Sequence, residues 1–380
     1  MGVNDGSVVG IVKVIDNGPD TDNWNLVITG DGFVQDELSD FATAVDTLVT
    51  FMQTQSPFDN ALVWSMINIY RLDVASNESG TDNINCASTT VATYFDSTIC
   101  ANGVARTMRI DAQLVKDTAD DQLPDWDALL VMVNTTDRGG TTLGGVAIRT
   151  LSSDVNEGCL HELGHAAFGF ADEYPYSLGC GKDDSSKNVF TGSEPVAPNV
   201  TISTSLATLK WASLVDPATP LPTLANPDCT QCPPTSSTYP AGTVGLFEGA
   251  SHHHCGVYRA ELDCRMNHAK SPYCAACSDV ILNTIFAAAP VCWVATAVYG
   301  DPLHPDVMTL RRWRDHHLAQ GARGATAMRL LAAGYARVGP PLARFTQPRP
   351  RLARLLRTGV FRPLTRVLRR SEGKLRLWPR

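Results

Sequence analysis

The chain has 380 residues, 44% of them hydrophobic and 18% charged, and this composition excludes a wholly disordered protein. Its 29 glycines and 23 prolines follow no strict period, which excludes collagen-like and low-complexity classes. The formal net charge of -8 is divided unevenly: residues 300–380 hold 18 Lys or Arg against 4 Asp or Glu, whereas residues 1–299 hold 13 against 35. This asymmetry predicts separate modules, and the acidic body argues against nucleic acid as the main partner.

Two features of the sequence bear on location. No segment offers about 18 uninterrupted apolar residues, so no transmembrane segment is expected. Residues 1–6 contain neither a basic n-region nor an apolar h-region, so no signal peptide is expected. Cytoplasmic residence is then the default prediction, and export by another route or a natural start further upstream is the alternative.

The first half of the chain predicts strands that alternate with helices. Residues 25–29 form a short apolar run stopped by Gly30-Asp31-Gly32, which is typical of a buried strand entering a turn, and we expect Asp31 to be structural. Residues 35–54 carry apolar side chains at the spacing of an amphipathic helix. Further strands are predicted at 64–74, at 128–133, which is fully apolar and so central, and at 144–149. This alternation predicts an α/β fold.

The second half predicts fewer regular elements. Residues 153–168 predict a helix, and Asp154 with Glu157 three positions later resembles a capping box. From about residue 175 to 250 the chain is rich in Pro, Ser, Thr and Gly, which predicts an irregular region that binds substrate or is cross-linked by disulfides. A short helix is predicted after Cys277, running to Ala289.

The segment His161-Glu162-Leu163-Gly164-His165 points to metal chemistry. Residues at i and i+4 share one face of a helix, so both imidazoles can reach one zinc ion. Glu162 follows the first histidine and is placed to take a proton from a water molecule activated by the metal. The sequence therefore predicts one catalytic zinc ion with Glu162 as general base.

A catalytic zinc site needs a third protein ligand and an open position. In the metzincin pattern a Gly ends the helix and a ligand follows three residues later. Gly169 and Asp172 keep this offset, although Gly169 lies four residues past His165 rather than three. Asp172 is the predicted third ligand and Glu173 the substitute; the alternative is a solvated acidic turn or a partner that supports a ligating histidine.

The eleven cysteines leave at least one without a disulfide partner. The pairs Cys229-x-x-Cys232 and Cys274-x-x-Cys277 can build a zinc ribbon, although the stretch between them is longer than usual. Disulfides are the competing interpretation and would favour an oxidising compartment. The residues alone leave this choice open.

Taken together and in order, several short segments resemble the IgA-peptidase-type zinc metalloendopeptidases. The likeness covers roughly residues 24–285. Its pieces are Val27 to Phe33, Pro57-Phe58, Ile67 to Tyr70, Ser76 to Gly80, the helix with its two histidines running on to Tyr174, Glu248 to Ala250, Gly256 to Arg259, Cys264-Arg265-Met266, and Tyr273 to Cys277. The resemblance implies zinc-dependent endopeptidase activity on a metzincin-like core. It does not imply that IgA is the substrate, and it suggests secretion.

The resemblance also directs attention to residues away from the histidine helix. Met266 becomes the candidate for the Met-turn below the metal, and Tyr258, or else Tyr174 or Tyr273, for a donor to the developing oxyanion. Apart from the resemblance, Gly145 to Ala147 are a candidate edge strand that would pair with an extended substrate, and an ordinary edge strand is the equal alternative. The run of three histidines at 252–254 has two candidate roles, neither of them the favoured interpretation: a substrate loop near the site and, less favoured, a second metal site.

The end of the chain resembles a different module. Residues 292–300, with Leu303 to Val307 and Leu310 to Asp315, resemble the bacterial CFI-box domain, with Trp293 in place of the eponymous Phe. The Arg-rich segments that follow carry Leu and Val at helical spacing. They are predicted to dock on the acidic body, with peripheral contact to an anionic membrane as the alternative.

These observations combine into one prediction. Residues 1–290 form an α/β catalytic domain with a metzincin-like core, a mixed twisted sheet and an active-site helix, and residues 291–380 form a small, basic, mainly helical module. The predicted activity is hydrolysis of peptide bonds in a protein or peptide substrate. The alternatives are a zinc amidase acting on a cell-wall or non-protein substrate, and a zinc-containing binding module without catalysis.

Overall fold

The computed structural model describes residues 2–288, 293–299, 304–313, 342, 345–346 and 349–366. The chain divides into two compact units. The first is formed by Met1–Val14, Leu26–Asp59 and Ile69–Leu282, and the second by Ile15–Asn25, Asn60–Asn68 and Asn283–Arg380. The predicted domain boundary at residues 290 and 291 lies outside the described residues, so that division stays a prediction.

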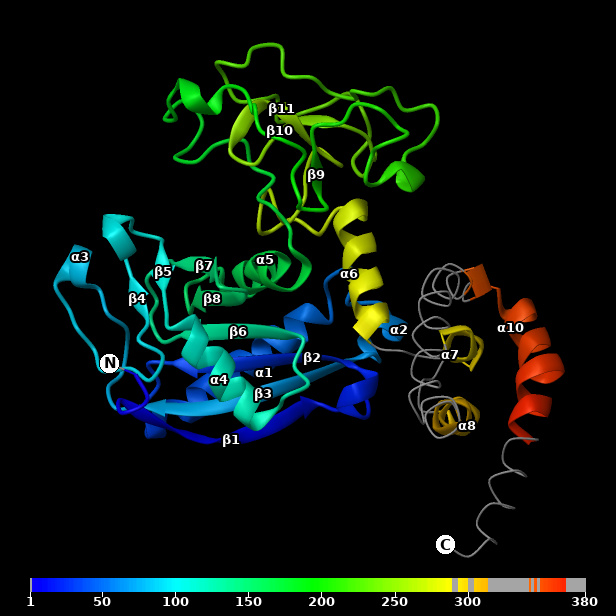
Figure 1. Cartoon of the computed structure of the whole chain (residues 1–380), viewed down its shortest axis with the longest axis horizontal. Coiled ribbons are helices and arrows are strands. Elements are labelled where there is room, and N and C mark those ends of the chain that lie inside the picture. Colours follow the sequence, from blue (N-terminus) through cyan, green and yellow to red (C-terminus); the bar gives the residue numbers. More distant parts are fainter. Residues whose placement is uncertain are drawn as a thin grey trace, which may run out of the picture. The chain divides into compact units, whose positions relative to one another are not determined.

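A six-stranded mixed sheet forms the centre of the first unit (Figure 1). Its strand order is β1 (Gly6–Ile15), β3 (Ile67–Ser76), β2 (Trp24–Asp31), β6 (Ala128–Val133), β8 (Val146–Thr150) and β7 (Gly140–Leu143). Strands β2, β6 and β8 run parallel, and β7 is antiparallel to β8. The predicted α/β architecture and the four predicted strands are confirmed, whereas β1 and β7 were not predicted.

The central strand β6 is apolar throughout because helices cover both faces of the sheet. Leu129 and Val131 share a buried cluster with Val115 of α4 (Ala112–Gln122), which crosses in front of the sheet in Figure 1. Leu130, which alternates with them along β6, is fully buried on the other face. On that face α1 (Leu38–Met52) and α5 (Val155–Phe168) pack side by side. One face of the sheet therefore supports α5, the helix that carries the two histidines.

The remaining elements of the described chain are short. The first unit contains α3 (Ile84–Ala87), β4 (Thr98–Ile99), β5 (Met108–Arg109), a small sheet of β10 (Phe247–Ala250), β11 (His253–Arg259) and β9 (Val200–Thr201), and 3-10 turns at Gln35–Glu37, Ala101–Gly103, Ser185–Lys187 and Ala212–Leu214. A further 3-10 turn at Asp20–Asp22 and α2 (Ala61–Trp64) belong to the second unit, and α6 spans Ala275–Ala288.

The N-terminal end of α5 differs from the predicted capping box. Asp154 stands at the N-cap position, but its side chain makes no capping hydrogen bond. Its carboxylate instead accepts from the Ser152 hydroxyl at 2.8 Å, from Arg138 at 2.9 Å and from the Arg149 guanidinium. Burial would raise the pKa of Asp154, but Ser152 and Arg149 lower it to about 2. Bonds to two positively charged arginines thus replace the bond to the helix backbone.

Three disulfides cross-link the first unit and answer the question that the cysteines left open. They join Cys86 to Cys100, Cys180 to Cys232 and Cys229 to Cys255. The second lies within the irregular region that was expected to be cross-linked, and the third joins that region to Cys255 of β11. A zinc ribbon between Cys229-x-x-Cys232 and Cys274-x-x-Cys277 is therefore wrong, because the first pair is consumed by disulfides, which are typical of oxidising compartments.

The helices described in the C-terminal part of the second unit are α7 (Trp293–Tyr299), α8 (Pro305–Trp313), α10 (Pro350–Leu356) and the π-helical turn η7 (Arg357–Phe361). Val298 and Val307 belong to their small apolar cluster, and the Arg357 guanidinium donates to the Val298 carbonyl at 2.6 Å. No helix of the described residues is long and apolar enough to cross a membrane. Cys292, Gly300 and Leu303 of the CFI-box resemblance lie outside the described residues, and that module and its docking stay predictions.

Candidate metal centre

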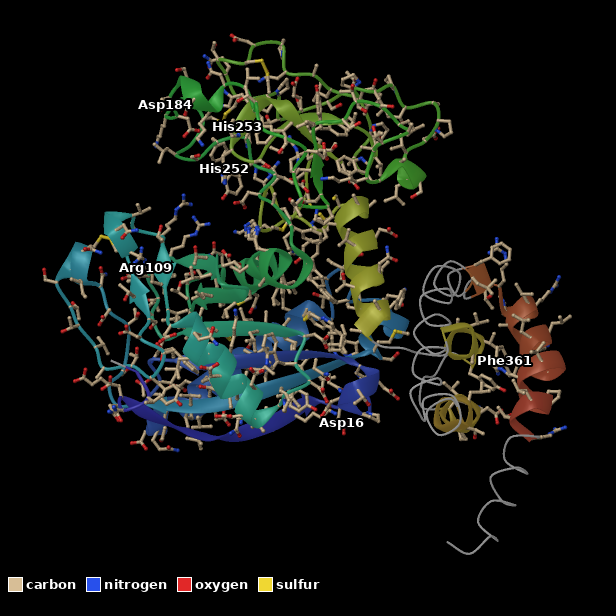
Figure 2. All side chains as sticks on the ribbon, viewed as in Figure 1. Asp16, Arg109, Asp184, His252, His253 and Phe361 are labelled. Atoms are coloured by element: carbon tan, nitrogen blue, oxygen red, sulfur yellow. A yellow bond between two sulfur atoms is a disulfide. The ribbon has the colours of Figure 1, made fainter. Side chains whose placement is uncertain are left out.

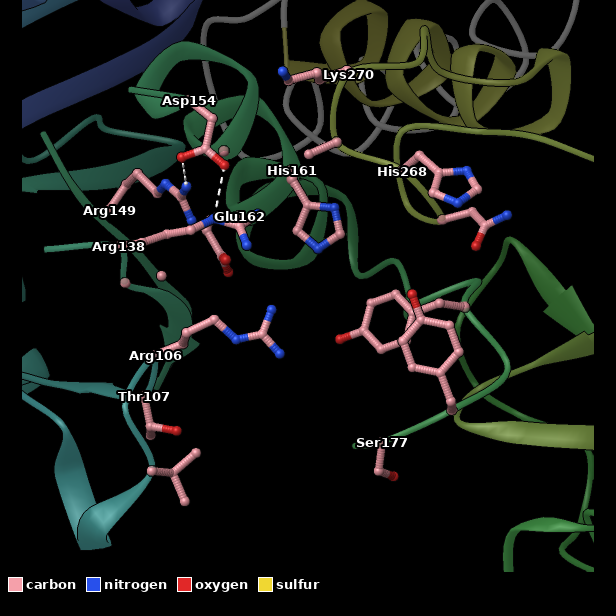
Figure 3. A pocket seen from close by; sticks show the side chains of 18 residues that line it. Arg106, Thr107, Arg138, Arg149, Asp154, His161, Glu162, Ser177, His268 and Lys270 are labelled. Atoms are coloured by element: carbon pink, nitrogen blue, oxygen red, sulfur yellow. Dashed lines mark hydrogen bonds and ion pairs between the residues drawn. The ribbon is translucent and has the colours of Figure 1, made fainter. Parts of the chain in front are cut away.

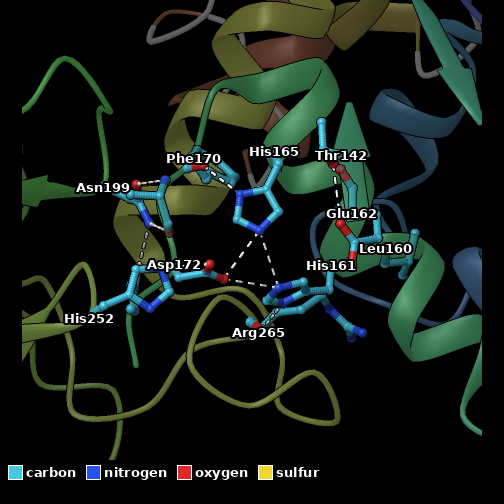
Figure 4. A network of polar contacts seen from close by, with 12 residues as sticks. Thr142, Leu160, His161, Glu162, His165, Phe170, Asp172, Asn199, His252 and Arg265 are labelled. Carbon is cyan, nitrogen blue, oxygen red and sulfur yellow. Dashed lines mark hydrogen bonds and ion pairs between the residues drawn. The ribbon is translucent and has the colours of Figure 1, made fainter. Parts of the chain in front are cut away.

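Helix α5 presents the two predicted histidines to one point. His161 and His165 are one helical turn apart, and their Nε2 atoms lie 3.3 Å from each other (Figure 4). Both rings are only partly exposed, with side-chain exposures of 14% and 18%. The i, i+4 spacing thus places two imidazole nitrogens at one side of the helix, as the sequence predicted.

The end of α5 directs Asp172 back to these histidines. Gly169 adopts a left-handed conformation with φ of 66°, and its N–H group and that of Phe170 bond to the carbonyls of His165 and Gly164. The reversed chain brings Asp172 Oδ1 to 3.2 Å from the Nε2 atom of each histidine. The residue added relative to the metzincin spacing is accommodated within the helix, which runs to Phe168 before the turn.

Two backbone carbonyls fix the orientation of the rings. His161 Nδ1 lies 2.9 Å from the Arg265 carbonyl oxygen, and His165 Nδ1 lies 2.7 Å from that of Phe170. A carbonyl oxygen only accepts hydrogen bonds, so each Nδ1 carries a proton, and in the neutral imidazole that binds a metal each Nε2 keeps its lone pair. The Arg265 carbonyl could not be identified from the sequence, because Arg265 lies 104 residues from His161.

Three acceptor atoms thus face one another and fit a divalent cation. A tetrahedral ion with bonds of ~2.0 Å places its ligand atoms ~3.3 Å apart, which matches the separations of 3.2 to 3.3 Å found here. Asp172 Oδ1 is buried, and no residue that the structure describes donates a hydrogen bond to it. Burial would lower the pKa of His165, but Asp172 raises it, to about 9, and the same negative field favours a bound cation.

Neighbouring residues hold Asp172 in place. The Asn199 side chain bonds to the N–H and the carbonyl of Ala171, at 2.9 and 2.8 Å, and Ser251 N–H donates to the Asp172 carbonyl. His252, at the margin of the small sheet in Figure 2, has its Nε2 atom 3.5 Å from Asp172 Oδ2. Asn199 was not predicted from the sequence, because a single amide in an irregular region carries no local signal.

The other two histidines of the run point elsewhere. The His253 ring packs edge-on against Phe190, with centroids 5.1 Å apart. His254 Nδ1 lies 3.0 Å from the Cys229 carbonyl oxygen. Among the described residues the three rings do not converge, and the second metal site considered for this run is wrong.

Glu162 lies beside the histidines and lines a pocket. Its side chain is buried, and its Oε2 atom accepts a hydrogen bond from the Thr142 hydroxyl at 3.2 Å. A Cβ atom at Gly140 would lie 2.8 Å from Glu162 Oε1, so the glycine leaves room for the carboxylate. Burial raises the pKa of Glu162, which is the direction that suits a carboxylate acting as a proton carrier near neutral pH.

The pocket has a volume of about 630 Å³ and a basic lining (Figure 3). Its walls include His161, Glu162 and Tyr174, and its basic residues are Arg106, Arg138, Arg149, His268 and Lys270. Arg138 and Arg149 are paired with Asp154. The Arg106 guanidinium makes no hydrogen bond or ion pair with any residue that the structure describes, and Figure 3 shows it pointing into the pocket. The pocket is basic although the body of the protein is acidic.

Met266 packs directly beneath the histidine helix. It is fully buried, and a Cβ atom at Gly164 would lie 2.6 Å from its Sδ atom. Gly164 thus gives the methionine room between the two histidines. Arg265, which precedes Met266, holds His161 through its carbonyl. Met266 therefore stays the predicted candidate for the Met-turn that the resemblance implies.

We expect Gly164→Ala to destabilise the chain by about 1–2 kcal/mol, because overpacking against Met266 costs ~1–3 kcal/mol and better helix propensity returns up to ~1 kcal/mol. Urea unfolding of Gly164→Ala, Met266→Ala and the double variant measures the coupling between the two sites. The double variant should lose clearly less stability than the sum of the single variants. Additive losses would contradict the packing described here.

Three residues that the sequence offered as candidates, Tyr258, Tyr273 and Glu173, do not place their side chains at the histidines. The Tyr258 hydroxyl interacts with Glu248 within the small sheet, and the Tyr273 hydroxyl donates to the Leu160 carbonyl. Tyr174 is the tyrosine of the three that lines the pocket. Glu173, the substitute third ligand, is fully buried and accepts from Asn199 at 3.0 Å instead of facing the histidines.

The predicted edge strand is wrong. Ala147 lies in β8, which pairs with β6 on one side and β7 on the other, and Gly145 lies in the turn between β7 and β8. The edge of the sheet at this end is β7. The reason is that residues 140–143 form an additional strand, whose short Gly-Thr-Thr-Leu run lacks the apolar pattern used to find strands.

Comparisons with known proteins bear on this site. A family model described as IgA Peptidase M64 matches residues 12–231, more than half of the chain. The matched segment contains His161, Glu162, His165 and Asp172 and ends before Met266. No curated protein matches the chain.

Proposed function

The chain belongs to the IgA Peptidase M64 family of metallopeptidases, and we propose that it is a zinc-dependent endopeptidase in which Glu162 is the general base. The observation that carries this proposal is the triangle of acceptor atoms from His161, His165 and Asp172, with sides of 3.2 to 3.3 Å, beside a buried carboxylate in an open pocket. Two neutral imidazoles and a carboxylate are ligands that zinc accepts, and three protein ligands leave one position open.

Zinc, when bound, supplies a Lewis acid that polarises the scissile carbonyl and lowers the pKa of water. Glu162 accepts the proton of the attacking water and passes it to the nitrogen of the leaving amine, so that the peptide bond is replaced by a carboxyl group and an amine. Thr142 orients the carboxylate of Glu162 through its hydrogen bond. A structural zinc site would have no need of a base at this position.

The substrate is proposed to be an extended peptide. Strand β7 is the edge of the sheet next to Glu162, since Thr142 of this strand bonds to that residue and Gly140 lines the pocket. An extended chain can add to such an edge through main-chain hydrogen bonds. The basic lining of the pocket favours acidic side chains close to the scissile bond. An edge strand beside Glu162 favours the endopeptidase over the alternative amidase, which requires no edge.

We expect chelation to abolish cleavage and zinc alone to restore it. The experiment strips the full-length chain of metal and measures digestion of a mixed peptide library before and after stoichiometric zinc, with mass spectrometry of the products. Internal cuts that depend on zinc, and that are enriched next to acidic residues, support the proposal. Cleavage that persists in the chelated chain, or that is confined to cell-wall peptides, would overturn the endopeptidase assignment.

A further inference from the structure

A second group of potential metal ligands is separate from the metal centre. It consists of Glu173, Cys264, Cys274 and Cys277, whose ligand atoms all lie within 4.8 Å of one another. All four side chains are buried, with exposures of 0 to 3%. We call these four residues the thiol cluster. Its cysteines belong to no disulfide, although the same chain contains three disulfides.

We propose that the thiol cluster binds a structural zinc ion, distinct from the ion of the peptidase site. The spacing of its atoms supports this. Cys264 Sγ lies 3.7 Å from Cys277 Sγ, and Cys277 Sγ lies 3.5 Å from Glu173 Oε1. A tetrahedral zinc ion with bonds to sulfur of ~2.3 Å and to oxygen of ~2.1 Å separates two sulfurs by ~3.8 Å and a sulfur from an oxygen by ~3.6 Å.

The backbone around the sulfurs is arranged for thiolates. Cys274 N–H donates to Cys264 Sγ at 3.3 Å, and Cys277 N–H donates to Cys274 Sγ at 3.4 Å. Cys274 directly precedes the first residue of α6, so the positive end of the helix dipole faces the cluster. The spacing Cys-x-x-Cys is also typical of structural zinc sites.

Glu173 carries an independent sign that a ligand is needed. It is fully buried, and its Oε2 atom has no hydrogen-bond partner among the described residues. Its Oε1 atom accepts from Asn199 at 3.0 Å. A buried carboxylate with an unpartnered oxygen is costly, and a cation bound at the carboxylate would offset that cost by neutralising its charge. The buried Arg259 interacts electrostatically with Glu173 and Cys264 and offsets part of the negative charge of four anionic ligands.

The alternative to a bound metal ion is a disulfide between two of the three cysteines. The separation of 3.7 Å between the sulfurs of Cys264 and Cys277 is that of two separate ligands and not of a bond. Three adjacent thiols in a chain that forms disulfides elsewhere would be open to oxidation, and coordination to zinc would protect them.

The proposed ion would join three segments that build the peptidase site. Glu173 follows Asp172, Cys264 directly precedes Arg265 and Met266, and the other two cysteines flank the start of α6. Glu173 N–H also donates to the Met266 carbonyl at 2.8 Å. A structural ion here would hold Asp172 and the carbonyl that orients His161 without contacting the substrate. The proposal does not depend on the peptidase assignment.

The test counts zinc and identifies its ligands in the full-length chain loaded with zinc alone. Elemental analysis should find about two zinc ions in the native chain and about one in a His161→Ala/His165→Ala double variant. X-ray absorption at the zinc edge should then show a mainly sulfur shell at ~2.3 Å in the double variant. A shell of nitrogen and oxygen only, or loss of all zinc from this folded variant, would overturn the proposal and leave the peptidase assignment untouched.

A matched pair of cysteine variants adds a second measurement. Cys277→Ala should lose the sulfur-bound ion, whereas Cys159→Ala, which removes a fully buried cysteine of α5 outside the cluster, should keep it. If Cys277→Ala does not fold, Glu173→Gln, which keeps the side-chain size, should lower the affinity for the same ion. Alkylation in denaturant without reductant should modify all three cluster cysteines, and a disulfide among them would refute the proposal.

Discussion

Replacement of Glu162 by Gln is expected to lower the turnover number by at least a hundredfold, within the ~10²–10⁴-fold range of a general base, while zinc content is unchanged. The amide has the shape of the carboxylate and can keep the hydrogen bond from Thr142, so the local structure should persist. It cannot accept a proton from water. The measurement compares the turnover number and the zinc content of Glu162→Gln with those of the native chain.

Glu157→Gln is the matched control, because Glu157 lies in the first turn of the same helix and does not line the pocket. It should retain native activity within a few-fold. If Glu162→Gln cleaves peptides as fast as this control, Glu162 is not the general base. If Glu162→Gln loses zinc together with activity, the substitution acts on metal binding. The role of Glu162 is then tested with other substitutions that keep the ion.

Replacement of Asp172 by Ala is expected to lower zinc affinity at the peptidase site by more than a hundredfold and to abolish activity at limiting zinc. Loss of a partner that merely supports a ligand costs ~10–100-fold, and removal of a ligand should exceed this. The reason is that Asp172 Oδ1 is the one anionic corner of the triangle with His161 and His165. Competition with a chromogenic chelator gives the affinity.

Two other replacements show whether Asp172 or a neighbour is the third ligand. His252→Ala removes a ring 3.5 Å from Asp172 Oδ2 and should cost ~10–100-fold in affinity, as expected of a supporting residue. Glu173→Gln should leave the ion of the peptidase site in place, because the Glu173 side chain faces the thiol cluster. A larger loss of this ion from Glu173→Gln than from Asp172→Ala would assign the ligand to Glu173.

Residues close in sequence allowed the most accurate predictions. The pair His161 and His165 came from the helical repeat alone, and β6 came from an uninterrupted apolar run that matches its bounds. The turn after α5 was less certain, because the offset from His165 to Gly169 differs from the metzincin pattern by one residue. The left-handed conformation of Gly169 explains how the chain still returns Asp172 to the histidines.

Predictions failed where distant residues competed for a group. Asp154 was expected to cap α5, but two arginines, one from β8 and one from a loop, take its carboxylate. Gly145 and Ala147 were expected at a sheet edge, but β7 covers β8. The zinc ribbon considered from the sequence paired the wrong cysteines. Cys274 and Cys277 lie beside Cys264 and Glu173, and not beside the other Cys-x-x-Cys pair.

The sequence by itself determined the chemistry that local spacing can encode: an α/β fold, a helix with two histidines and a glutamate, and a short list of third ligands. Only the tertiary structure decided which acid faces the histidines, which carbonyls orient them, and which cysteines meet. The physical reason is that hydrogen bonds, disulfides and metal ligands act over a few ångströms between residues that can be far apart in the chain, such as His161 and Arg265, which are 104 positions apart. Such distances become short only after the sheet and its covering helices have packed.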